Sequence, residues 1–219
     1  VKSLMGIVPQ EAQLFEMLTV RETLKIFGKL RGLSGRDARR RADEIISELR
    51  LDAHRNVVNI KLSGGLKRRV MVGLAALAEP DLIVLDEPTT GLDPQSRRDL
   101  WILVREHRSR GAAILMTTHY MDEAEALCDR VGIISNGRLL ALDSIERLKS
   151  AHGYEFKVTY SVDGKNGASE TIYGKDDREL VERVRARGVR QFSVGRTTLE
   201  DVYLALTGDE VADGGSNAE

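Results

Sequence analysis

The chain has 219 residues, of which 42% are hydrophobic, and this is enough apolar content for one large domain or a domain with a small appendage. Lys and Arg total 33 against 34 Asp and Glu, so the formal net charge of −1 gives no global electrostatic reason to bind nucleic acid or an anionic membrane. The single cysteine, Cys128, excludes an intrachain disulfide and is expected to fill core space in a reducing compartment. The longest apolar run, 70–78, is far short of the roughly 20 residues that a membrane-spanning helix needs.

The first part of the chain predicts one strand followed by helices. Residues 3–8 are short and mostly apolar, which predicts a buried strand that ends at Gln10. Thr19 begins a capping box, and Ser34 is suited to cap a second helix. We therefore expect a helical insertion over about residues 11–60.

The next part of the chain alternates helical and strand patterns. In chain order we expect a helix over 65–78, a strand over 81–85, a helix over 94–109, a strand over 112–117, a helix over 121–128 and a hairpin of strands 131–135 and 138–142. This alternation predicts an α/β fold with a largely parallel sheet covered by helices and with the hairpin as an antiparallel edge.

The pattern changes after a short helix expected over 143–149. It continues with strands over 156–162 and 169–173 around the loop 163–167, a helix over 177–187, a strand over 189–194 and a helix over 198–206. We therefore expect a first domain over residues 1–150 and a small α+β domain over 151–207. Residues 208–219 are polar and glycine-rich without periodicity, which predicts a disordered tail.

Two adjacent carboxylates follow the aliphatic run 82–85, which suits a strand buried on both faces. Open α/β sheets bind ligands at the carboxyl edge of their strands, where Asp86 and Glu87 are expected to lie. Because side chains alternate along a strand, the two should have different functions. Asp86 would hold Mg²⁺, directly or through water, and Glu87 would face an attacking water as general base or polariser. A solvated turn is the alternative for an isolated Asp-Glu-Pro.

Gln10 and His119 follow two other expected strands and should lie at the same edge of the sheet. The Gln10 amide would reach the same metal or water. His119 would donate a hydrogen bond to a terminal phosphate or orient the water beside Glu87. Taken singly, such a Gln is more often a surface residue and such a His is more often structural.

A glycine-rich turn, Ser63-Gly64-Gly65, precedes the helix expected over 65–78, and Lys67 and Arg68 lie in its first turn. The hydroxyl, the bare backbone, the positive helix end and both cations would converge on an anion. The turn alone is a weak signal. A much stronger one is the whole set in this order: Gln10, Ser63, Gly64, Gly65, Asp86, Glu87, Asp93 and His119.

In that order and context, residues 3–149 resemble the nucleotide-binding domain of ATP-binding cassette (ABC) transporters. The resemblance implies a P-loop NTPase-like fold that binds ATP and Mg²⁺ and hydrolyses the ATP. In that family two cassettes sandwich two ATP molecules, so each signature contacts the nucleotide held by the other subunit. The resemblance assigns roles to the matching residues: Gln10 in the Q-loop, 62–65 in the signature, 82–86 in the Walker B strand, Glu87 as catalytic glutamate, 91–93 in the D-loop and His119 as switch histidine.

The sequence departs from this family pattern in three places. Leu66 stands where glutamine is usual, and Gly91 stands where another small residue is common. No G-x-x-x-x-G-K-[ST] phosphate loop occurs, and the chain begins with Val1 just ahead of a strand pattern. We therefore expect that an upstream segment has been cut away and that this fragment alone is inactive. The segments 66–69 and 198–208 resemble those of multidrug-type exporters of the DrrA and NatA kind.

The resemblance implies partners as well as chemistry. A homodimer or a second cassette would complete the ATP sites, and a separate transmembrane permease subunit would be driven by them. The location would be cytoplasmic, at the inner face of the membrane. The insertion at 11–60 would dock the permease. Its arginines either meet acidic groups there or form a solvated helix face: Arg36, Arg39, Arg40 and Arg41. The domain at 151–207 would regulate or stabilise the dimer.

Two alternatives use the same residues differently. A cassette ATPase acting on nucleic acid or ribosomes would share the nucleotide chemistry, but such proteins usually carry a long coiled coil or a second cassette, and neither pattern occurs here. Because the charge is nearly neutral, no direct nucleic acid partner is expected. A regulatory protein that lacks the phosphate loop is the other alternative.

Overall fold

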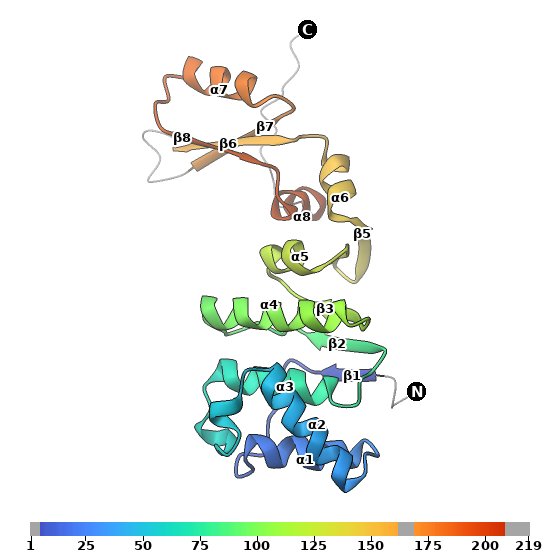
Figure 1. Cartoon of the computed structure of the whole chain (residues 1–219). Coiled ribbons are helices and arrows are strands. Elements are labelled where there is room, and N and C mark those ends of the chain that lie inside the picture. Colours follow the sequence, from blue (N-terminus) through green and yellow to red (C-terminus); the bar gives the residue numbers. More distant parts are fainter. Residues whose placement is uncertain (1–4, 162–168, 209–219) are drawn as a thin grey trace. The chain divides into compact units, whose positions relative to one another are not determined.

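The computed structural model describes residues 5–161 and 169–208. The chain divides into two compact units, Val1–Tyr120 and Met121–Glu219 (Figure 1). Three sequence predictions lie outside the described residues: the start of the first strand at 3–4, the loop at 163–167 and the tail from 209 onward. The domain boundary expected at residue 150 falls inside the second unit and stays a prediction.

The first unit contains a three-stranded sheet and four α-helices among its described residues. Its strands are β1 (Met5–Val8), β2 (Leu82–Asp86) and β3 (Ala113–Thr117). Its helices are α1 (Val20–Leu30), α2 (Gly35–Glu48), α3 (Gly64–Ala76) and α4 (Pro94–Ser109), with short 3₁₀ turns η1 (Asp52–His54) and η2 (Asn59–Lys61). The predicted capping box is confirmed, because Thr19 and Glu22 bond reciprocally, and Ser34 caps α2 as expected.

The sheet of the first unit is parallel, with strand order β1-β2-β3 (Figure 1). Val8 pairs with Leu85, and Asp86 pairs with Thr117. All three strands therefore end at the same edge. This places the segments that follow them, and the residues predicted to act there, side by side.

Helix α3 packs closely on one face of this sheet. A Cβ on Gly6 would lie 2.1 Å from the Ala75 carbonyl oxygen, so only glycine permits this approach. The same face buries Ile83 and Leu85. On the opposite face Leu82 and Val84 of β2 are half-buried, whereas Ile7 of β1 and Leu115 of β3 are exposed.

The second unit contains a hairpin, a small sheet and four helices among its described residues. The hairpin is β4 (Arg130–Ser135) with β5 (Arg138–Ser144), and the sheet has β6 (Phe156–Ser161), β7 (Ser169–Gly174) and β8 (Phe192–Arg196) in the antiparallel order β7-β6-β8. The helices are α5 (Met121–Leu127), α6 (Ile145–His152), α7 (Asp177–Ala186) and α8 (Leu199–Thr207). The hairpin forms a two-stranded sheet of its own, not the predicted edge of the parallel sheet.

Two apolar clusters hold the second unit together. One joins Leu199 and Val202 of α8 to Ala124, Ile133 and Leu148. The other lies between the small sheet and α7: Val158, Tyr160, Leu180 and Val184. The residues expected to form one appendage, 151–207, therefore contribute to both clusters. Cys128 was expected to fill core space, but it is only half-buried.

Candidate functional site

Three residues predicted to act together meet at the carboxyl edge of the parallel sheet. The Gln10 Nε2 donates to Glu87 Oε2 at 2.9 Å, and His119 Nδ1 lies 3.3 Å from the same oxygen. The Thr90 hydroxyl also donates to it at 2.9 Å. We call Gln10, Glu87, Thr90 and His119 the carboxyl-edge cluster.

The carboxyl-edge cluster is open to solvent. The Glu87 side chain is 26% exposed, and the His119 side chain is 53% exposed. Both hydrogen bonds to the carboxylate and the His119 contact fall on Oε2, and within the described part of the chain Oε1 accepts no hydrogen bond. One carboxylate oxygen is thus held in place while the other stays available to a water or ligand.

The backbone at Glu87 separates its side chain from that of Asp86. Strand β2 ends at Asp86, and Glu87 has φ of +42°, a left-handed conformation that is uncommon for a residue with a side chain. The Glu87 N–H donates to the Thr117 carbonyl at 3.1 Å and to the Thr117 hydroxyl at 3.0 Å. The same hydroxyl donates to Asp86 Oδ1. The two carboxylates thus have different partners, and their separate functions stay a prediction.

Arg68 does not join an anion site, so this part of the prediction is wrong. Its side chain turns inward, is buried, and donates to five backbone carbonyls. These belong to the last residue of β2 and to the segments that follow β1 and β2: Asp86, Pro9, Gln10, Glu87 and Pro88. A helix position three residues after buried Gly65 and four before buried Val72 faces the core, and this spacing is the signal that could have shown it.

The glycine turn begins α3 as predicted. The Ser63 hydroxyl caps the helix by accepting from the Leu66 N–H at 3.4 Å. The first N–H groups of the helix, at Gly64 and Gly65, have no acceptor within the helix. A Cβ on Gly64 would meet nothing within 4 Å, so this side of the turn is open to a ligand.

Gly65 brings the glycine turn against the start of α4. A Cβ there would lie 2.4 Å from the Ser96 Oγ, and Ser96 Oγ donates to Asp93 Oδ2 at 2.6 Å. Asp93 also accepts from the backbone N–H groups of Gln95 and Ser96, and thereby caps α4. The Ser96 hydroxyl bond, with these backbone bonds, lowers the pKa of Asp93. Sequence reasoning missed Ser96, Thr90 and Thr117, because single hydroxyl residues carry no spacing signal.

The side-chain oxygens at the carboxyl edge of the parallel sheet suit a metal ion that is also bound by a phosphate. No group of three or more His, Cys, Asp or Glu side chains is placed to hold a metal ion in the described ranges. Asp86 and Gln10 each offer a side-chain oxygen, whereas Mg²⁺ takes six oxygens in near-octahedral geometry and usually keeps several waters. The residues therefore fit Mg²⁺ bound mainly by phosphate and water.

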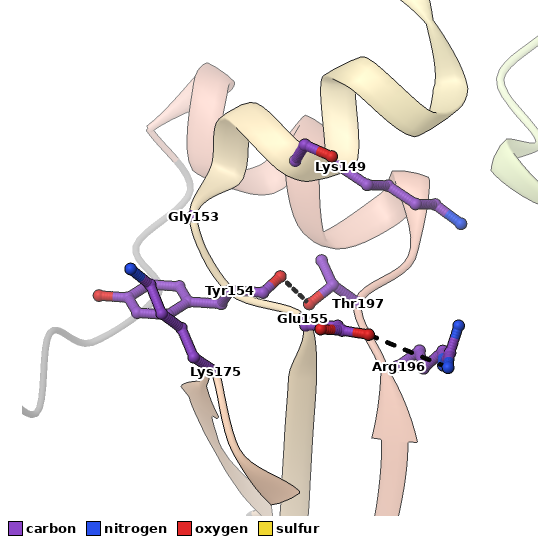
Figure 2. A pocket seen from close by; sticks show the side chains of 8 residues that line it. Lys149, Gly153, Tyr154, Glu155, Lys175, Arg196 and Thr197 are labelled. Atoms are coloured by element: carbon purple, nitrogen blue, oxygen red, sulfur yellow. Dashed lines mark hydrogen bonds and ion pairs between the residues drawn. The ribbon is translucent and has the colours of Figure 1, made fainter.

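A cavity of about 600 Å³ lies in the second unit, but its lining has no cluster of side chains like the carboxyl-edge cluster. In Figure 2 Lys175 lies beside Tyr154, on the other side from Lys149 and Arg196, and Arg196 is directed to Glu155. Lys149 pairs with Glu125 at 3.0 Å. Because Lys149 and Arg196 are paired with carboxylates and Lys175 lies apart from them, these side chains do not form an anion site.

Two of the four arginines at the start of α2 form ion pairs within the first unit. Arg40 pairs with Glu44 at 2.7 Å on the same helix. Arg41 is buried and pairs with Glu48 at 3.0 Å. Arg36 and Arg39 are exposed. In the described parts of the chain, no helix is both long and apolar enough to cross a bilayer.

Comparisons with known proteins point to one family. The family described as ABC transporter matches residues 1–90. The chain is 36% identical to Nod factor export ATP-binding protein I of Burkholderia lata over 95% of this chain and 74% of that protein. It is 35% identical to daunorubicin/doxorubicin resistance ATP-binding protein DrrA of Streptomyces peucetius, over 97% of this chain and 72% of the relative.

Two further similarities are consistent with these. Linearmycin resistance ATP-binding protein LnrL of Bacillus subtilis is 39% identical over 76% of this chain, which spans about half of the relative at 54%. A solved structure titled "Structure of ATP binding subunit of ABC transporter" matches with a TM-score of 0.60 and 33% identity, over 69% of this chain and 63% of the other. The predicted α/β fold is therefore confirmed.

Proposed function

Because the chain belongs to the ATP-binding subunits of ABC transporters, of the DrrA-like and NodI-like exporter type, we propose that it hydrolyses MgATP in a head-to-tail dimer that powers a separate membrane permease. The observation that supports this most directly is the convergence of Gln10, Thr90 and His119 on one oxygen of Glu87. This geometry suits a carboxylate that must act on a water while its own position is fixed.

The side chains of the cluster have separate functions in this proposal. Glu87 polarises the attacking water or accepts its proton through the available Oε1. His119 contacts the terminal phosphate, and Gln10 reaches the metal or the water. Asp86 and Gln10 would hold Mg²⁺, which when bound neutralises charge on the phosphate oxygens.

We propose that the glycine turn acts on the nucleotide of the other subunit. Ser63, Gly64 and Gly65 present a hydroxyl and helix N–H groups to a phosphate, which the positive end of α3 also favours. Asp93 holds the start of α4 against this turn through Ser96. One dimer would therefore contain two sites, each completed in trans by a homodimer partner or a second cassette.

Docking of the permease is assigned to the helical insertion at 11–60. Its surface exposes large apolar side chains in and near the segment that follows Gln10, with Met17 at 77% exposure. Phe15, Leu30 and Ile60 are exposed as well. The Ile60 N–H donates to the Glu16 carbonyl at 3.1 Å, which ties η2 to this segment. We propose that these residues contact the permease, with the subunit at the cytoplasmic face of the membrane.

Substitution of Glu87 tests the proposed reaction. The assay uses the intact protein, meaning the full-length product of the gene. Glu87→Gln should retain ATP binding, accumulate the closed dimer and lower kcat by at least about 100-fold, because the general base is lost. Glu146→Gln, at an exposed position of α6, is the matched control and should leave kcat unchanged. Unchanged hydrolysis by Glu87→Gln would remove this residue from the mechanism.

Two neighbouring glycines test the trans contact. Gly64→Ala has open space and should preserve folding but weaken ATP-dependent dimerisation. Gly65→Ala would clash with Ser96 and should cost about 1–3 kcal/mol of folding stability. Sedimentation of both variants in the Glu87→Gln background, with and without ATP, separates the two effects. Normal ATP-dependent dimers of Gly64→Ala would contradict the proposed contact.

The second candidate is the regulatory protein without a phosphate loop that the sequence left open, which would not hydrolyse ATP. Sequencing the coding DNA directly upstream of the Val1 codon distinguishes the two. A continuous frame that contains G-x-x-x-x-G-K-[ST] supports the transport ATPase, and an in-frame stop without it supports the regulator. We propose negligible ATP hydrolysis by residues 1–219 alone, and robust turnover by the purified chain would contradict this.

We also propose that residues 151–207 regulate or stabilise the dimer. A truncation after Ser150 would be a poor test, because it removes Leu199 and Val202 from the cluster that contains Ala124 and Ile133. Surface substitutions on α7 test the proposal without disturbing that core. If charge reversals at the exposed Glu179 and Glu182 leave dimerisation and ATPase activity unchanged, α7 takes no part in it.

A further inference from the structure

The guanidinium of Arg68 is bonded at every donor position. Its Nε donates to the Pro88 carbonyl at 2.7 Å, and Nη2 donates to Asp86 and Glu87 at 2.8 and 2.7 Å. Its Nη1 donates to Pro9 and Gln10, both at 3.3 Å. Arginine has five N–H donors in a rigid plane, and here each meets a backbone carbonyl. The residue is only 8% exposed.

These carbonyls belong to the two segments that carry the proposed catalytic side chains. One segment follows β1 and contains Gln10, and the other begins at Asp86, the last residue of β2, and contains Glu87. Arg68 itself is in α3, four residues after Gly64. A single side chain thus connects the helix of the glycine turn to both segments of the carboxyl-edge cluster.

The conformation of Glu87 explains why such a clamp is needed. A non-glycine residue in the left-handed region costs on the order of 1–3 kcal/mol and persists only where its surroundings fix it. Thr117 accepts from the Glu87 N–H, and Arg68 takes the carbonyls of Asp86, Glu87 and Pro88. The peptide groups on both sides of Glu87 are therefore held.

We propose that Arg68 is a positioning residue: it fixes the backbones of Gln10 and Glu87 relative to the glycine turn, so that nucleotide contact at the turn and water activation at Glu87 are coupled within one subunit. The proposal rests on the proposed function for its kinetic consequence, but not for its structural one. Lysine cannot replace arginine here, because an ammonium has three donors and no planar fork.

Hydrogen exchange on residues 1–219 tests the structural part without any ATPase activity. Arg68→Lys should speed exchange of the Glu87 and Thr90 amides by at least about tenfold, because both bonds depend on the held turn. Arg69→Gln is the matched control: it removes a neighbouring arginine of α3, which pairs with Asp99, and should leave these amides protected. Equal protection in Arg68→Lys and wild type would overturn the proposal.

Steady-state kinetics of the intact protein test the functional part. Arg68→Lys should lower kcat by about tenfold or more and leave KM for ATP within about threefold, since the reacting group is displaced but binding is retained. Arg69→Gln should keep kcat within about twofold. A purely structural role would lower the folded fraction alone, so a normal kcat per folded molecule in Arg68→Lys would contradict the proposal.

The two arms separate the failure of this inference from the failure of the proposed function. If wild-type protein does not hydrolyse ATP, or if Glu87→Gln remains active, the proposed function fails, and the exchange arm alone decides the positioning role. If Glu87→Gln is inactive and Arg68→Lys behaves as wild type in both arms, the inference fails by itself.

Discussion

Glu87 in the first unit and Asp201 in the second are both held by several donors. The two carboxylates differ in how many of their oxygens are bonded and in how exposed the side chain is. The donors of Glu87 all bind one oxygen, and the side chain stays 26% exposed. Those of Asp201 use both oxygens, and its side chain is only 6% exposed. A carboxylate with one available oxygen can act on a ligand, whereas a fully bonded and buried one serves the fold.

The donors around Asp201 come from three elements of the second unit. Lys157 of β6 donates to Oδ1 at 2.9 Å and to Oδ2 at 2.8 Å. Tyr173 of β7 donates to Oδ1 at 2.9 Å, and the Thr198 N–H and hydroxyl both donate to Oδ2 at 2.7 Å. We call Lys157, Tyr173, Thr198 and Asp201 the α8 anchor, because together they join α8 to the small sheet.

Burial and hydrogen bonding act in opposite directions on this carboxylate. Burial alone raises the pKa of Asp201, but the bonds from Lys157, Thr198 and Tyr173 outweigh it and leave the pKa below the ordinary value. For Tyr173, burial and the bond to Asp201 act together and raise the pKa of the phenol. The anchor is therefore built to keep Asp201 charged and Tyr173 neutral at ordinary pH.

The largest effect is expected from removing the carboxylate of the α8 anchor. Asp201→Ala leaves Lys157 largely buried without its partner and should cost about 3–5 kcal/mol of folding stability in the second unit. Asp176→Ala, which removes the exposed cap of α7, should cost only about 1 kcal/mol. Hydrogen exchange of β6 amides in increasing denaturant measures both losses. Similar losses for the two variants would contradict the distinction between an anchor and a cap.

Lowering the pH should remove the stabilisation by the Asp201 carboxylate gradually, whereas Asp201→Ala removes it at once. Because folding lowers the pKa of Asp201, its contribution is complete above the unfolded value near 3.9 and is lost as pH falls through the folded pKa. The difference in stability between wild type and Asp201→Asn should therefore be constant near neutrality and shrink below about pH 4. Urea titrations of both proteins from pH 7 to 3 measure it. A difference that does not change with pH would mean that ionisation of Asp201 does not matter.

The sequence predicted the carboxyl-edge cluster better than the α8 anchor, for a physical reason. Gln10, Glu87 and His119 each follow a strand, and parallel strands end at one edge, so topology brings them together. Lys157, Tyr173 and Asp201 are spread over 45 residues with no common spacing to the strands' ends, and only the packing of α8 brings them together.

Other differences have equally local causes. The last strand of the small sheet was predicted over 189–194 but begins at Phe192, because Gly188 ends the turn after α7 in a left-handed conformation and pairing with β6 starts only at Phe192. Arg68 was predicted to face an anion, because it lies in the first turn of the helix that follows the glycine turn, at the positive end of that helix. Arg68 points inward because the turns after β1 and β2 leave backbone carbonyls without partners in the sheet, and its guanidinium donates to them.

A smaller effect is expected from removing the Thr117 hydroxyl, which accepts a hydrogen bond from the Glu87 N–H. Thr117→Val keeps the shape but removes the bonds to the Glu87 N–H and to Asp86. We expect kcat of the intact protein to fall by about tenfold, or 1.4 kcal/mol, because the catalytic carboxylate is less fixed. Thr159→Val in β6 also loses a hydroxyl bond, to Thr171, but should leave kcat unchanged. If both variants keep full kcat, Thr117 does not help to position Glu87.

The smallest effect is expected when one donor of the α8 anchor is removed and the rest remain. Tyr173→Phe keeps the ring contacts with His152 and Tyr154 and leaves Lys157 and Thr198 bonded to Asp201, so it should cost only about 1 kcal/mol. Tyr160→Phe removes the bonds of its hydroxyl to Glu170 and Arg187, both half-exposed, and should cost less, because water can replace the phenol at both partners. Chemical denaturation gives both values. If Tyr173→Phe costs as much as Asp201→Ala, the phenol and not the lysine is the main support of Asp201.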